Sequence, residues 1–464
     1  MANKIATEKQ IYYVKPSMEK EEIVTKQVQE LIDKCAIDGG EIRFSSGEYV
    51  LTTVYLKSGV SIVIEEDATI LGSLDFNDYD FHEKIDYPLY QDASHSYFNC
   101  SMFVGIDCDN ISITGAGKID MRSVWDEENK RDMVHRGAKT ISLKNCHNVN
   151  ISDIGIYNTT DLAIYFAGCE NVLIERVKMR VHIDGISPDC SKNVVIRGCE
   201  VESGDDGIVL KSSYTLNKLD ICKNILIENC RVKSFCNAIK FGTESNGGFE
   251  DITIRDIEIY DTRITALALE TVDGAKINNI KISDIKMKNV CGAPIFIHIG
   301  MRMRAPEGLQ IGTVSNVSIE NVTVDGPYEP FDIITANYNS FKAKEGRCYP
   351  WFYKVNDEES KEPFRRLWHV TSNICGLEGN PIRNVSIKNL KMRLYGGVNE
   401  FNADVPKIPK GYPEVYVYGE VLPASGIYFR NVKGLVMGNV NVETYKPDVR
   451  EPFVYESVEE LQTI

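Results

Sequence analysis

The chain has 464 residues, 43% of them hydrophobic, and its 67 acidic and 52 basic side chains give a formal net charge of −15. This acidic balance argues against nucleic-acid or anionic-membrane partners, and more weakly against a polyanionic substrate, because like charges repel. The apolar content suffices for a large core, and all-β folds of this length often form one unit. We therefore expect a single domain over residues 1–464.

The N-terminal stretch MANKIATEKQ lacks the apolar centre of a signal peptide, and no run approaches the roughly eighteen apolar residues of a membrane span. Thirteen cysteines are scattered without a CxxC pair, in similar contexts such as KNCHN and RGCEV. This pattern favours reduced structural cysteines over disulfides or a zinc site. We expect a cytoplasmic protein, although removal of a signal peptide would leave the same mature chain.

Residues 20–35 predict the first element, an amphipathic helix with Ile23, Val28, Leu31 and Ile32 on one stripe. We expect it to belong to an N-terminal cap over about residues 1–38. Beyond it, short strands rich in Val and Ile alternate with Asn, Asp and Gly turns. A phrase N-[VI]-x-I recurs at Asn110, Asn148, Asn171, Asn193, Asn224, Asn279, Asn316 and Asn384, with DITI at Asp251. Such repeats predict a β-solenoid with one coil per repeat.

The repeats also predict which residues become neighbours. Six segments align: LAIYFA from Leu162, DGISPD from Asp184, DGIVLK from Asp206, NAIKFG from Asn237, TALALE from Thr265 and APIFIH from Ala293. Their third and fifth residues are mostly large and apolar and should point into the solenoid, whereas the mixed fourth and sixth residues should point outward. Equivalent residues on neighbouring coils then lie about 4.8 Å apart. Asp184 and Asp206, 22 residues apart, should therefore meet.

Two segments rich in aromatic and charged residues interrupt the rhythm, at 74–100 and 326–383. Long insertions in a compact fold are usually functional or disordered. Their aromatic content favours ordered lobes that wall a groove.

Three carboxylates, Asp184, Asp205 and Asp206, are expected to converge at the start of two strands. Adjacent residues on a strand point to opposite faces, so Asp205 and Asp206 must lie at a turn or bulge to serve one site. Turn chemistry explains any one of these aspartates, but three on adjacent coils favour a catalytic cluster. Crowding drives their pKa values apart, and glycosidic cleavage needs both an acid and a base.

Two blocks carry a resemblance to a known family: GGEIRFSSGEYVLTTVYLKSGVSIVIEEDATILGS (39–73) and DGISPDCSKNVVIRGCEVESGDDGIVLKS (184–212). From the N-terminal cap to about residue 325, the sequence resembles glycoside hydrolase family 28, the polygalacturonase-like right-handed parallel β-helices. The family's Asn-Thr-Asp motif appears as HID at 182–184, and its Asp-Asp motif is intact at 205–206.

The resemblance implies an inverting hydrolase in which Asp205 is the general acid, while Asp184 and Asp206 hold and deprotonate a water molecule. It implies a carbohydrate substrate and a pair of carboxyl groups about 6.5–9.5 Å apart. We expect no cofactor and no metal. The oligomeric state stays open.

Two family motifs are lost. The Gly-His-Gly motif falls on Cys236-Asn237-Ala238 and the Arg-Ile-Lys motif falls on Ala268-Leu269-Glu270. In polygalacturonases those cations hold the uronate carboxylate, so we expect a neutral or mixed plant glycoside of rhamnose, xylose or apiose type, cleaved from a chain end. The predicted substrate-binding residues are His182, Lys211, Asn237, Lys240, Glu244, Glu270, His298 and Arg302.

Three alternatives stay open. A galacturonan hydrolase of the exo-polygalacturonase or rhamnogalacturonase type could recognise a uronate through Lys240, Lys211 or Arg302. A β-eliminating lyase shares the solenoid but needs an Arg or Lys base and often Ca²⁺. A non-catalytic carbohydrate-binding β-helix is the alternative from another class.

Overall fold

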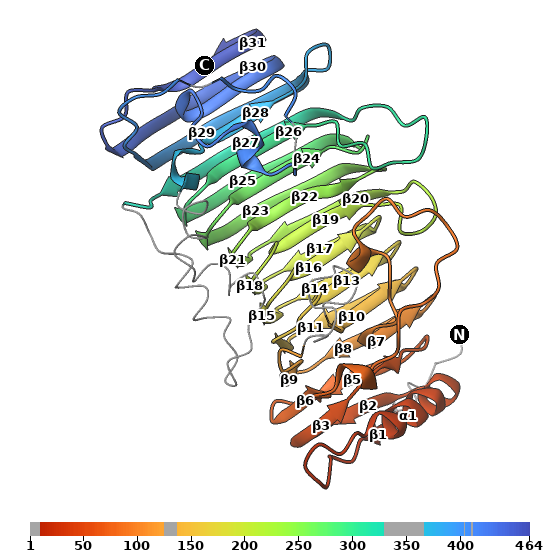
Figure 1. Ribbon diagram of the computed structural model, residues 1–464. Coiled ribbons are helices and arrows are strands. Elements are labelled where there is room, and N and C mark those ends of the chain that lie inside the picture. The colour runs from red at the N-terminus through yellow and green to blue at the C-terminus, as the bar shows by residue number, and fades with distance from the viewer. Residues whose placement is uncertain (1–9, 125–136, 329–365, 403, 410–411) are drawn as a thin grey trace, which may run out of the picture.

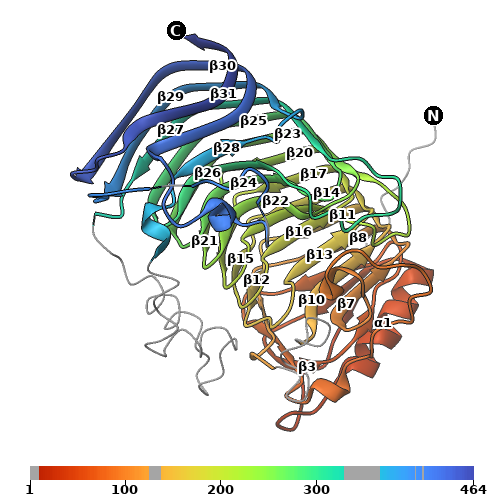
Figure 2. The same cartoon turned by 45° about the horizontal axis from the view of Figure 1, so that its top comes forward.

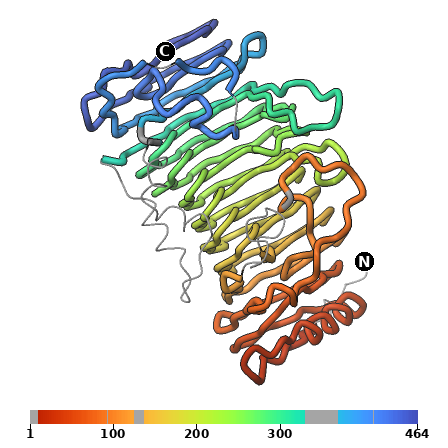
Figure 3. The backbone as a smooth tube through the Cα atoms, viewed as in Figure 1, coloured from red at the N-terminus to blue at the C-terminus, as the bar shows by residue number. Residues whose placement is uncertain are grey.

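Parallel strands stacked along one axis form most of the molecule (Figure 1). The computed structural model describes residues 10–124, 137–328, 366–402, 404–409 and 412–464. The helix α1 (Thr25–Asp38) lies at one end of the stack and strand β31 (Glu451–Thr463) at the other, as the tube in Figure 3 shows. The predicted parallel β-helix is confirmed.

Each coil contributes strands to up to three columns of the stack. The first column contains β4 (Val54–Tyr55), β7 (Ser101–Ile106), β10 (Lys139–Lys144), β13 (Ile164–Ala167), β16 (Ile186–Asp189), β19 (Ile208–Ser212), β22 (Asn237–Ser245), β24 (Thr265–Thr271), β26 (Ala293–Ile299) and β28 (Ser372–Cys375). The second contains β1 (Ile11–Tyr13), β2 (Glu41–Phe44), β5 (Ser61–Ile64), β8 (Asp109–Thr114), β11 (His147–Ser152), β14 (Glu170–Glu175), β17 (Lys192–Arg197) and β20 (Ile221–Glu228).

The third column contains β3 (Gly47–Leu51), β6 (Ala68–Gly72), β9 (Lys118–Asp120), β12 (Gly155–Tyr157), β15 (Lys178–Val181), β18 (Glu200–Ser203) and β21 (Arg231–Ser234). Later strands run through the bend between the second and third columns: β23 (Gly248–Thr262), β25 (Lys276–Val290), β27 (Thr313–Asp325) and β29 (Ile382–Gly396). Strand β30 (Ala424–Lys446) pairs with both β28 and β29, and β31 pairs with β30.

The strand register of the first column is the predicted one. Ile186 pairs with Ile208, and Ile208 pairs with Ile239 on the next coil. The alternation then places Lys240 beside Val209, as the sequence alignment predicts. A shift of one residue would exchange the buried apolar column for the polar one, so the hydrophobic pattern enforces this register.

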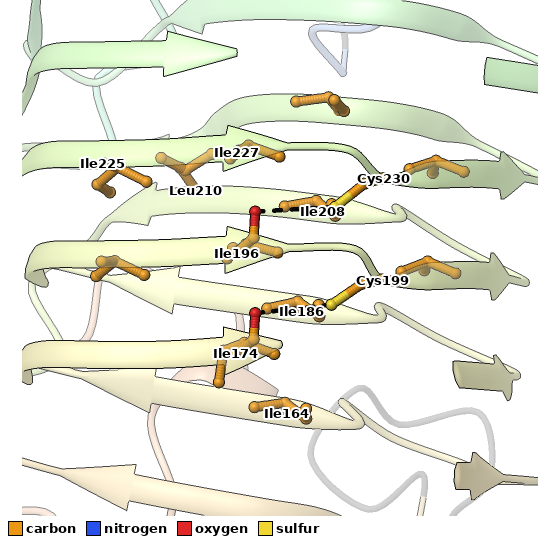
Figure 4. Packing of buried hydrophobic residues seen from close by; sticks show 14 of the residues in the cluster. Ile164, Ile174, Ile186, Ile196, Cys199, Ile208, Leu210, Ile225, Ile227 and Cys230 are labelled. Atoms are coloured by element: carbon orange, nitrogen blue, oxygen red, sulfur yellow. Dashed lines mark hydrogen bonds between the residues drawn. The ribbon is translucent and has the colours of Figure 1, made fainter. Parts of the chain in front are cut away.

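Isoleucines of successive coils fill the interior in stacked rows. Figure 4 shows Ile174, Ile196 and Ile227 one above another, and each is completely buried. Burial of each such side chain stabilises the fold by roughly 1.5–3 kcal/mol. The thiols of Cys199 and Cys230 lie in the same interior as further small buried groups, each directed at a backbone carbonyl of the coil before it.

The recurring asparagines have a conformational role at the bend into the second column. All nine residues of the repeated phrase, Asp251 included, have a left-handed φ between 54° and 58°, a conformation that Asn and Asp tolerate better than most residues. Their side chains also bond from coil to coil, because Asn193 Nδ2 donates to Asn171 Oδ1 at 3.2 Å and Asn224 Nδ2 donates to Asn193 Oδ1 at 2.7 Å. The repeat therefore encodes both the bend and a polar ladder.

The N-terminal helix begins five residues later than predicted, at Thr25. Val28 and Ile32 of the predicted stripe are buried, but Ile23 is 43% exposed. The backbone of Ile23 forms a β-bridge with Val50, and Glu22 accepts hydrogen bonds from the backbone of the turn before it, so these residues stay outside the helix. No helix in the described parts of the chain has the length and apolar character to span a membrane.

Three of the long connections between strands bear on the predictions and on the site. The predicted insertion at 74–100 contains two short 3₁₀ helices, η1 (Phe76–Asp78) and η2 (Ala93–His95). Residues 329–365 of the predicted insertion at 326–383 lie outside the described residues, and η3 (Arg366–His369) follows them. A third connection, 397–423 between β29 and β30, includes η4 (Val415–Tyr418) and was not predicted.

The left-handed bend gives a testable prediction at Asn193. Replacing Asn193 with Ala removes its ladder bonds and places a Cβ residue at a φ of 54°, whereas Asn193→Gly removes only the bonds. We expect the Ala variant to melt at a lower temperature than the Gly variant, by an equivalent of about 1 kcal/mol. Thermal unfolding followed by circular dichroism measures this, and equal melting temperatures would contradict the conformational role.

Candidate active site

Asp184, Asp205 and Asp206 converge as predicted, and we call them the acid cluster. One carboxylate oxygen from each lies within 4.8 Å of those of the other two. Asp184 precedes β16 and the other two precede β19, so the cluster lies where two adjacent coils enter the first column. Asp184 and Asp206 are buried and Asp205 is partly exposed.

The backbone of each coil is tied to the next through these residues. The backbone N–H of Asp206 donates to Asp184 Oδ1 at 3.2 Å, and that of Asn237 donates to Asp206 Oδ1 at 3.2 Å. Each side chain thus accepts a hydrogen bond from the equivalent residue of the following coil. The position of the carboxylates is fixed by the same coil-to-coil contacts that build the solenoid.

The turn that presents the two adjacent aspartates is tightly packed. The hydroxyls of Ser203 and Ser234 both donate to the carbonyl oxygen of Asp205, at 2.8 and 2.5 Å. A Cβ at Gly204 would lie 2.2 Å from the carbonyl oxygen of His182, so only glycine fits there. Asp205 and Asp206 therefore stand at a turn rather than within a strand, as predicted.

The environment of Asp206 favours a protonated carboxyl group. Burial raises the pKa of Asp206 to about 8, Lys240 opposes this shift, and Asp205, Asp184 and Glu414 add to it. Lys240 Nζ lies 3.6 Å from Asp206 Oδ2, and Asn237 Nδ2 donates to Oδ1 at 2.7 Å. The acid cluster therefore retains a proton near neutral pH.

Lys240 is surrounded by carboxylates. Its Nζ lies 2.5 Å from Glu414 Oε1 and 3.8 Å from Glu270 Oε1, in addition to its contact with Asp206. Burial opposes the charge on Lys240, but the three acids raise its pKa well above the usual value. Burial raises the pKa of Glu270 well above its usual range, although Lys240 opposes the shift.

A second charged group adjoins the first. Lys211 Nζ donates to Glu244 Oε2 at 2.9 Å, and the Arg302 guanidinium pairs with Asp273, with Nε 3.0 Å from Oδ1. Arg302 also lies 3.9 Å from Glu244. Burial opposes ionisation of Glu244, but Lys211, His95 and Arg302 lower its pKa well below the usual value. Both cations are therefore already neutralised by protein carboxylates.

The two predicted histidines lie in different surroundings. His182 Nε2 is 2.7 Å from the Ser123 hydroxyl, and burial lowers the pKa of His182 to about 3. His298 Nδ1 is 2.7 Å from the Tyr418 hydroxyl, and burial lowers the pKa of His298 to about 3, with Arg430 adding to the shift. The His298 ring stacks on Phe296, within an apolar cluster formed with the 397–423 connection. Its predicted role in substrate binding stays a prediction.

The outward-facing column is buried, although its side chains point away from the interior of the solenoid as the sequence predicts. Lys211, Lys240 and Glu270 are 4%, 2% and 0% exposed. The reason is the connection 397–423, which folds back over this face and lies across β22, β24 and β26 in Figure 2. Electrostatic interactions between these buried side chains are stronger than they would be at an exposed surface, because little water screens them.

Several side chains of this region were missed by sequence reasoning. His95 of the insertion 74–100 lies 3.9 Å from Asp184 Oδ2, and Tyr165 donates to its backbone carbonyl at 2.7 Å. Glu414 contacts Lys240, and the Tyr412 hydroxyl is 3.1 Å from Thr243 Oγ1. The run GYPEVYVYGE, which breaks the repeat at 411–420, was the available signal for the last two.

Three carboxylates this close can also hold a cation. Hard divalent cations take several oxygen ligands, and the donor set here is three aspartates with Lys240 beside one of them. The ammonium already compensates part of the negative charge. The residues present therefore give no specific support for a metal.

A separate hollow of about 530 Å³ lies on the second column and is lined by Glu170, Lys192, Asn193, Lys223, Asn224, Asp251, Thr253, Asn279 and Lys281. None of the predicted site residues lines it. Lys192 pairs with Asp220 and Lys223 pairs with Glu250, at 2.8 and 3.0 Å. Its chemistry is that of a solvated polar strand face, and we place the active site at the acid cluster.

A family model described as glycosyl hydrolases family 28 matches residues 41–342, which include the whole acid cluster. The chain belongs to this family. A probable polygalacturonase of Vitis vinifera is 23% identical over 243 residues, which cover 50% of this chain and 49% of the relative. The chain thus spans about half the length of that relative. The exopolygalacturonase X-1 of Emericella nidulans is 21% identical over 371 residues, covering 66% of this chain and 81% of the relative.

A solved structure from family 28 is also similar to the structure of this chain. The solved structure of the Yersinia enterocolitica family 28 exopolygalacturonase aligns with a TM-score of 0.70 and 16% identity, covering 98% of this chain and 78% of that one. At this identity the match establishes the shared fold. The resemblance inferred from the sequence motifs is confirmed.

The raised pKa of Asp206 predicts how stability depends on pH. Between the unfolded pKa of about 3.9 and the folded pKa of about 8, the native state holds a proton that the unfolded state releases. Stability from this group is therefore lost as pH rises through that window. Asp206→Asn removes the ionisable group and with it this loss of stability. The free energy of unfolding of the variant minus that of the wild type should therefore increase from pH 4 to pH 8, by up to about 1.4 kcal/mol per pH unit.

Denaturant unfolding at pH 5 and pH 8 measures this difference. Asp67→Asn is the matched control, because it removes an exposed aspartate that lies outside the acid cluster. A pH-independent difference for Asp206→Asn would contradict the protonated state.

Proposed function

We propose that this family 28 protein is an inverting glycoside hydrolase that removes neutral or mixed sugars of rhamnose, xylose or apiose type from the ends of plant-derived oligosaccharides or glycosides. One observation carries the proposal: a cluster of three aspartates adjoins a site in which Lys211, Lys240 and Arg302 are already paired with carboxylates. The cluster supplies the acid and base that hydrolysis needs.

The proton balance of the cluster fits hydrolysis. The proton retained near neutral pH passes within the cluster to Asp205, the partly exposed member, leaving Asp184 and Asp206 as carboxylates. Asp205 gives this proton to the glycosidic oxygen as its bond to the anomeric carbon breaks. A water molecule held by Asp184 and Asp206 adds to that carbon and gives up its proton to them.

The closeness of the acids follows from the fold. One oxygen from each carboxylate lies within 4.8 Å of those of the other two, because the strands of adjacent coils are held about 4.8 Å apart. This distance joins nearest oxygens, whereas the values of about 6.5–9.5 Å for inverting pairs and about 5–5.5 Å for retaining pairs describe whole carboxyl groups. The inverting assignment therefore rests on the family motif, and the anomer of the product tests it.

A neutral sugar is favoured by the charge of the site. Lys211, Lys240 and Arg302 each have an acidic partner. These partners are Glu244, Glu270, Asp273 and Glu414. A uronate carboxylate would meet cations that protein carboxylates already compensate, and it would have to displace one of these carboxylates to pair with a cation. Action at a chain end is supported by the connections 74–100 and 397–423, which reach the cluster and Lys240.

A galacturonan hydrolase is the second candidate. Two relatives support it, since the Emericella nidulans and Yersinia enterocolitica proteins are both exopolygalacturonases. For a galacturonan hydrolase, Lys240, Lys211 or Arg302 would have to release its protein carboxylate and pair with the carboxylate of the sugar.

A substrate panel separates the two candidates. We expect turnover of neutral aryl-glycosides or mixed oligosaccharides, little turnover of oligogalacturonides, and an inverted anomer by proton NMR at early times. Preferred hydrolysis of oligogalacturonides would support the second candidate, and a retained anomer would contradict the inverting mechanism.

Removal of the proposed acid provides a second test. Asp205→Asn should lower kcat by roughly 10²–10⁴-fold, because the amide cannot donate a carboxylic proton to the leaving oxygen. Sugar binding and melting temperature should change little, because Asp205 is partly exposed and its carbonyl contacts are preserved. An unchanged rate would contradict the role, and sugar binding without turnover by the wild type would indicate a non-catalytic binding protein.

Chelation tests the lyase alternative. Because hydrolysis by aspartates needs no cation, EDTA should leave the rate unchanged. β-Elimination would be indicated instead if EDTA abolished the activity, Ca²⁺ restored it, and the product were unsaturated and absorbed in the ultraviolet.

A further inference from the structure

We propose that Glu414 determines substrate specificity by occupying, with its own carboxylate, the position in which Lys240 and Asn237 could hold an acidic sugar. The inference rests on the proposed function and names the residue that restricts it to neutral sugars. Glu414 is a positioning and specificity residue in this proposal, with no part in bond cleavage.

The carboxylate of Glu414 is held as a bound ligand would be. Its Oε1 lies 2.5 Å from Lys240 Nζ, and Asn237 Nδ2 donates to its two oxygens at 3.3 and 3.2 Å. An ammonium and an amide directed at one carboxylate form a charge-assisted site. The side chain reaches this site from a connection 177 residues away along the chain, and Glu414 is 5% exposed.

This position adjoins the acid cluster. Asn237 Nδ2 donates to Asp206 as well as to Glu414, and Lys240 contacts both carboxylates. A sugar bound at the cluster would therefore bring its substituents to the place where Glu414 lies. Burial favours the protonated forms of the other two acids beside Lys240, Asp206 and Glu270. A uronate would therefore compete directly with Glu414 for the charge of Lys240.

The connection that carries Glu414 is anchored on both sides. The Tyr412 hydroxyl contacts Thr243 Oγ1, and the Tyr418 hydroxyl contacts His298 Nδ1 at 2.7 Å. Val415 and Tyr418 are buried in the apolar cluster on β24 and β26. These contacts hold the connection in place, so that the side chain of Glu414 lies against Lys240.

A simpler role is that Glu414 only compensates the charge of a buried lysine. Removal of such a counterion lowers stability, because it leaves Lys240 with less compensation. That role predicts no change in which sugars bind. Ligand selectivity therefore separates the two interpretations, whereas melting temperature alone does not.

The test compares Glu414→Ala, Glu414→Gln and the control Glu400→Ala. Glu400 is exposed on the same connection, so its loss changes the net charge equally but leaves Lys240 paired. Binding of D-galacturonate and D-galactose is measured for each protein by calorimetry at constant ionic strength. Melting temperature is measured in sodium acetate and in sodium chloride.

We expect the ratio of galacturonate to galactose affinity to rise on the order of tenfold in Glu414→Ala, since a vacated cation then accepts the sugar carboxylate. Glu414→Gln should show a smaller rise, because repulsion is removed while the space stays filled. Acetate should raise the melting temperature of the Ala variant more than that of the wild type or Glu400→Ala, by filling the vacated position.

An unchanged affinity ratio in both variants would overturn the inference, whatever their stability. If Glu414→Ala does not fold, the ratio in Glu414→Gln and in the wild type decides alone. The substrate panel on the wild type tests the proposed function separately. Neutral-sugar turnover with an unchanged ratio refutes only the role of Glu414, whereas preferred oligogalacturonide turnover by the wild type refutes the proposed substrate class.

Discussion

Backbone hydrogen bonds between successive coils set the distances on which every other feature of this molecule depends. At the cluster, Gly185 N donates to Asp206 O and Gly207 N donates to Asn237 O, at 3.0 and 2.8 Å. Residues far apart in sequence are thereby held at the spacing of paired strands. The same ladder brings one carboxylate oxygen from each of three aspartates within 4.8 Å of those of the other two.

Concentrated acids need compensation, and the charge pattern of the site follows from that need. Burial raises the pKa of Asp206 and of Glu270 although Lys240 opposes both shifts, whereas Lys211, His95 and Arg302 together lower the pKa of Glu244. Lys211, Lys240 and Arg302 are each paired with a protein carboxylate, and this pairing is the basis of the proposed preference for neutral sugars. Family membership and substrate preference are therefore separate questions for this chain.

The periodic part of the sequence predicted the structure well because its signals are local. Alternating apolar residues specify which face is buried, and an Asn at each bend tolerates a left-handed φ. Once the repeats are aligned, register follows, and with it the meeting of Asp184 with Asp206. The insertion 74–100 was also evident as an interruption, although His95, its residue beside Asp184, carries no local signature.

The solenoid, its register, the acid cluster and the family could all be predicted from the chain, since each depends on repeated patterns or contiguous motifs. What covers the outward column became evident only from the folded molecule. Glu414 reaches Lys240 across 174 positions, and a contact of that separation depends on how a non-repeating connection folds back over the coils. Periodicity cannot encode such a path, so the burial of Lys240 and the charge balance of the site emerge only in three dimensions.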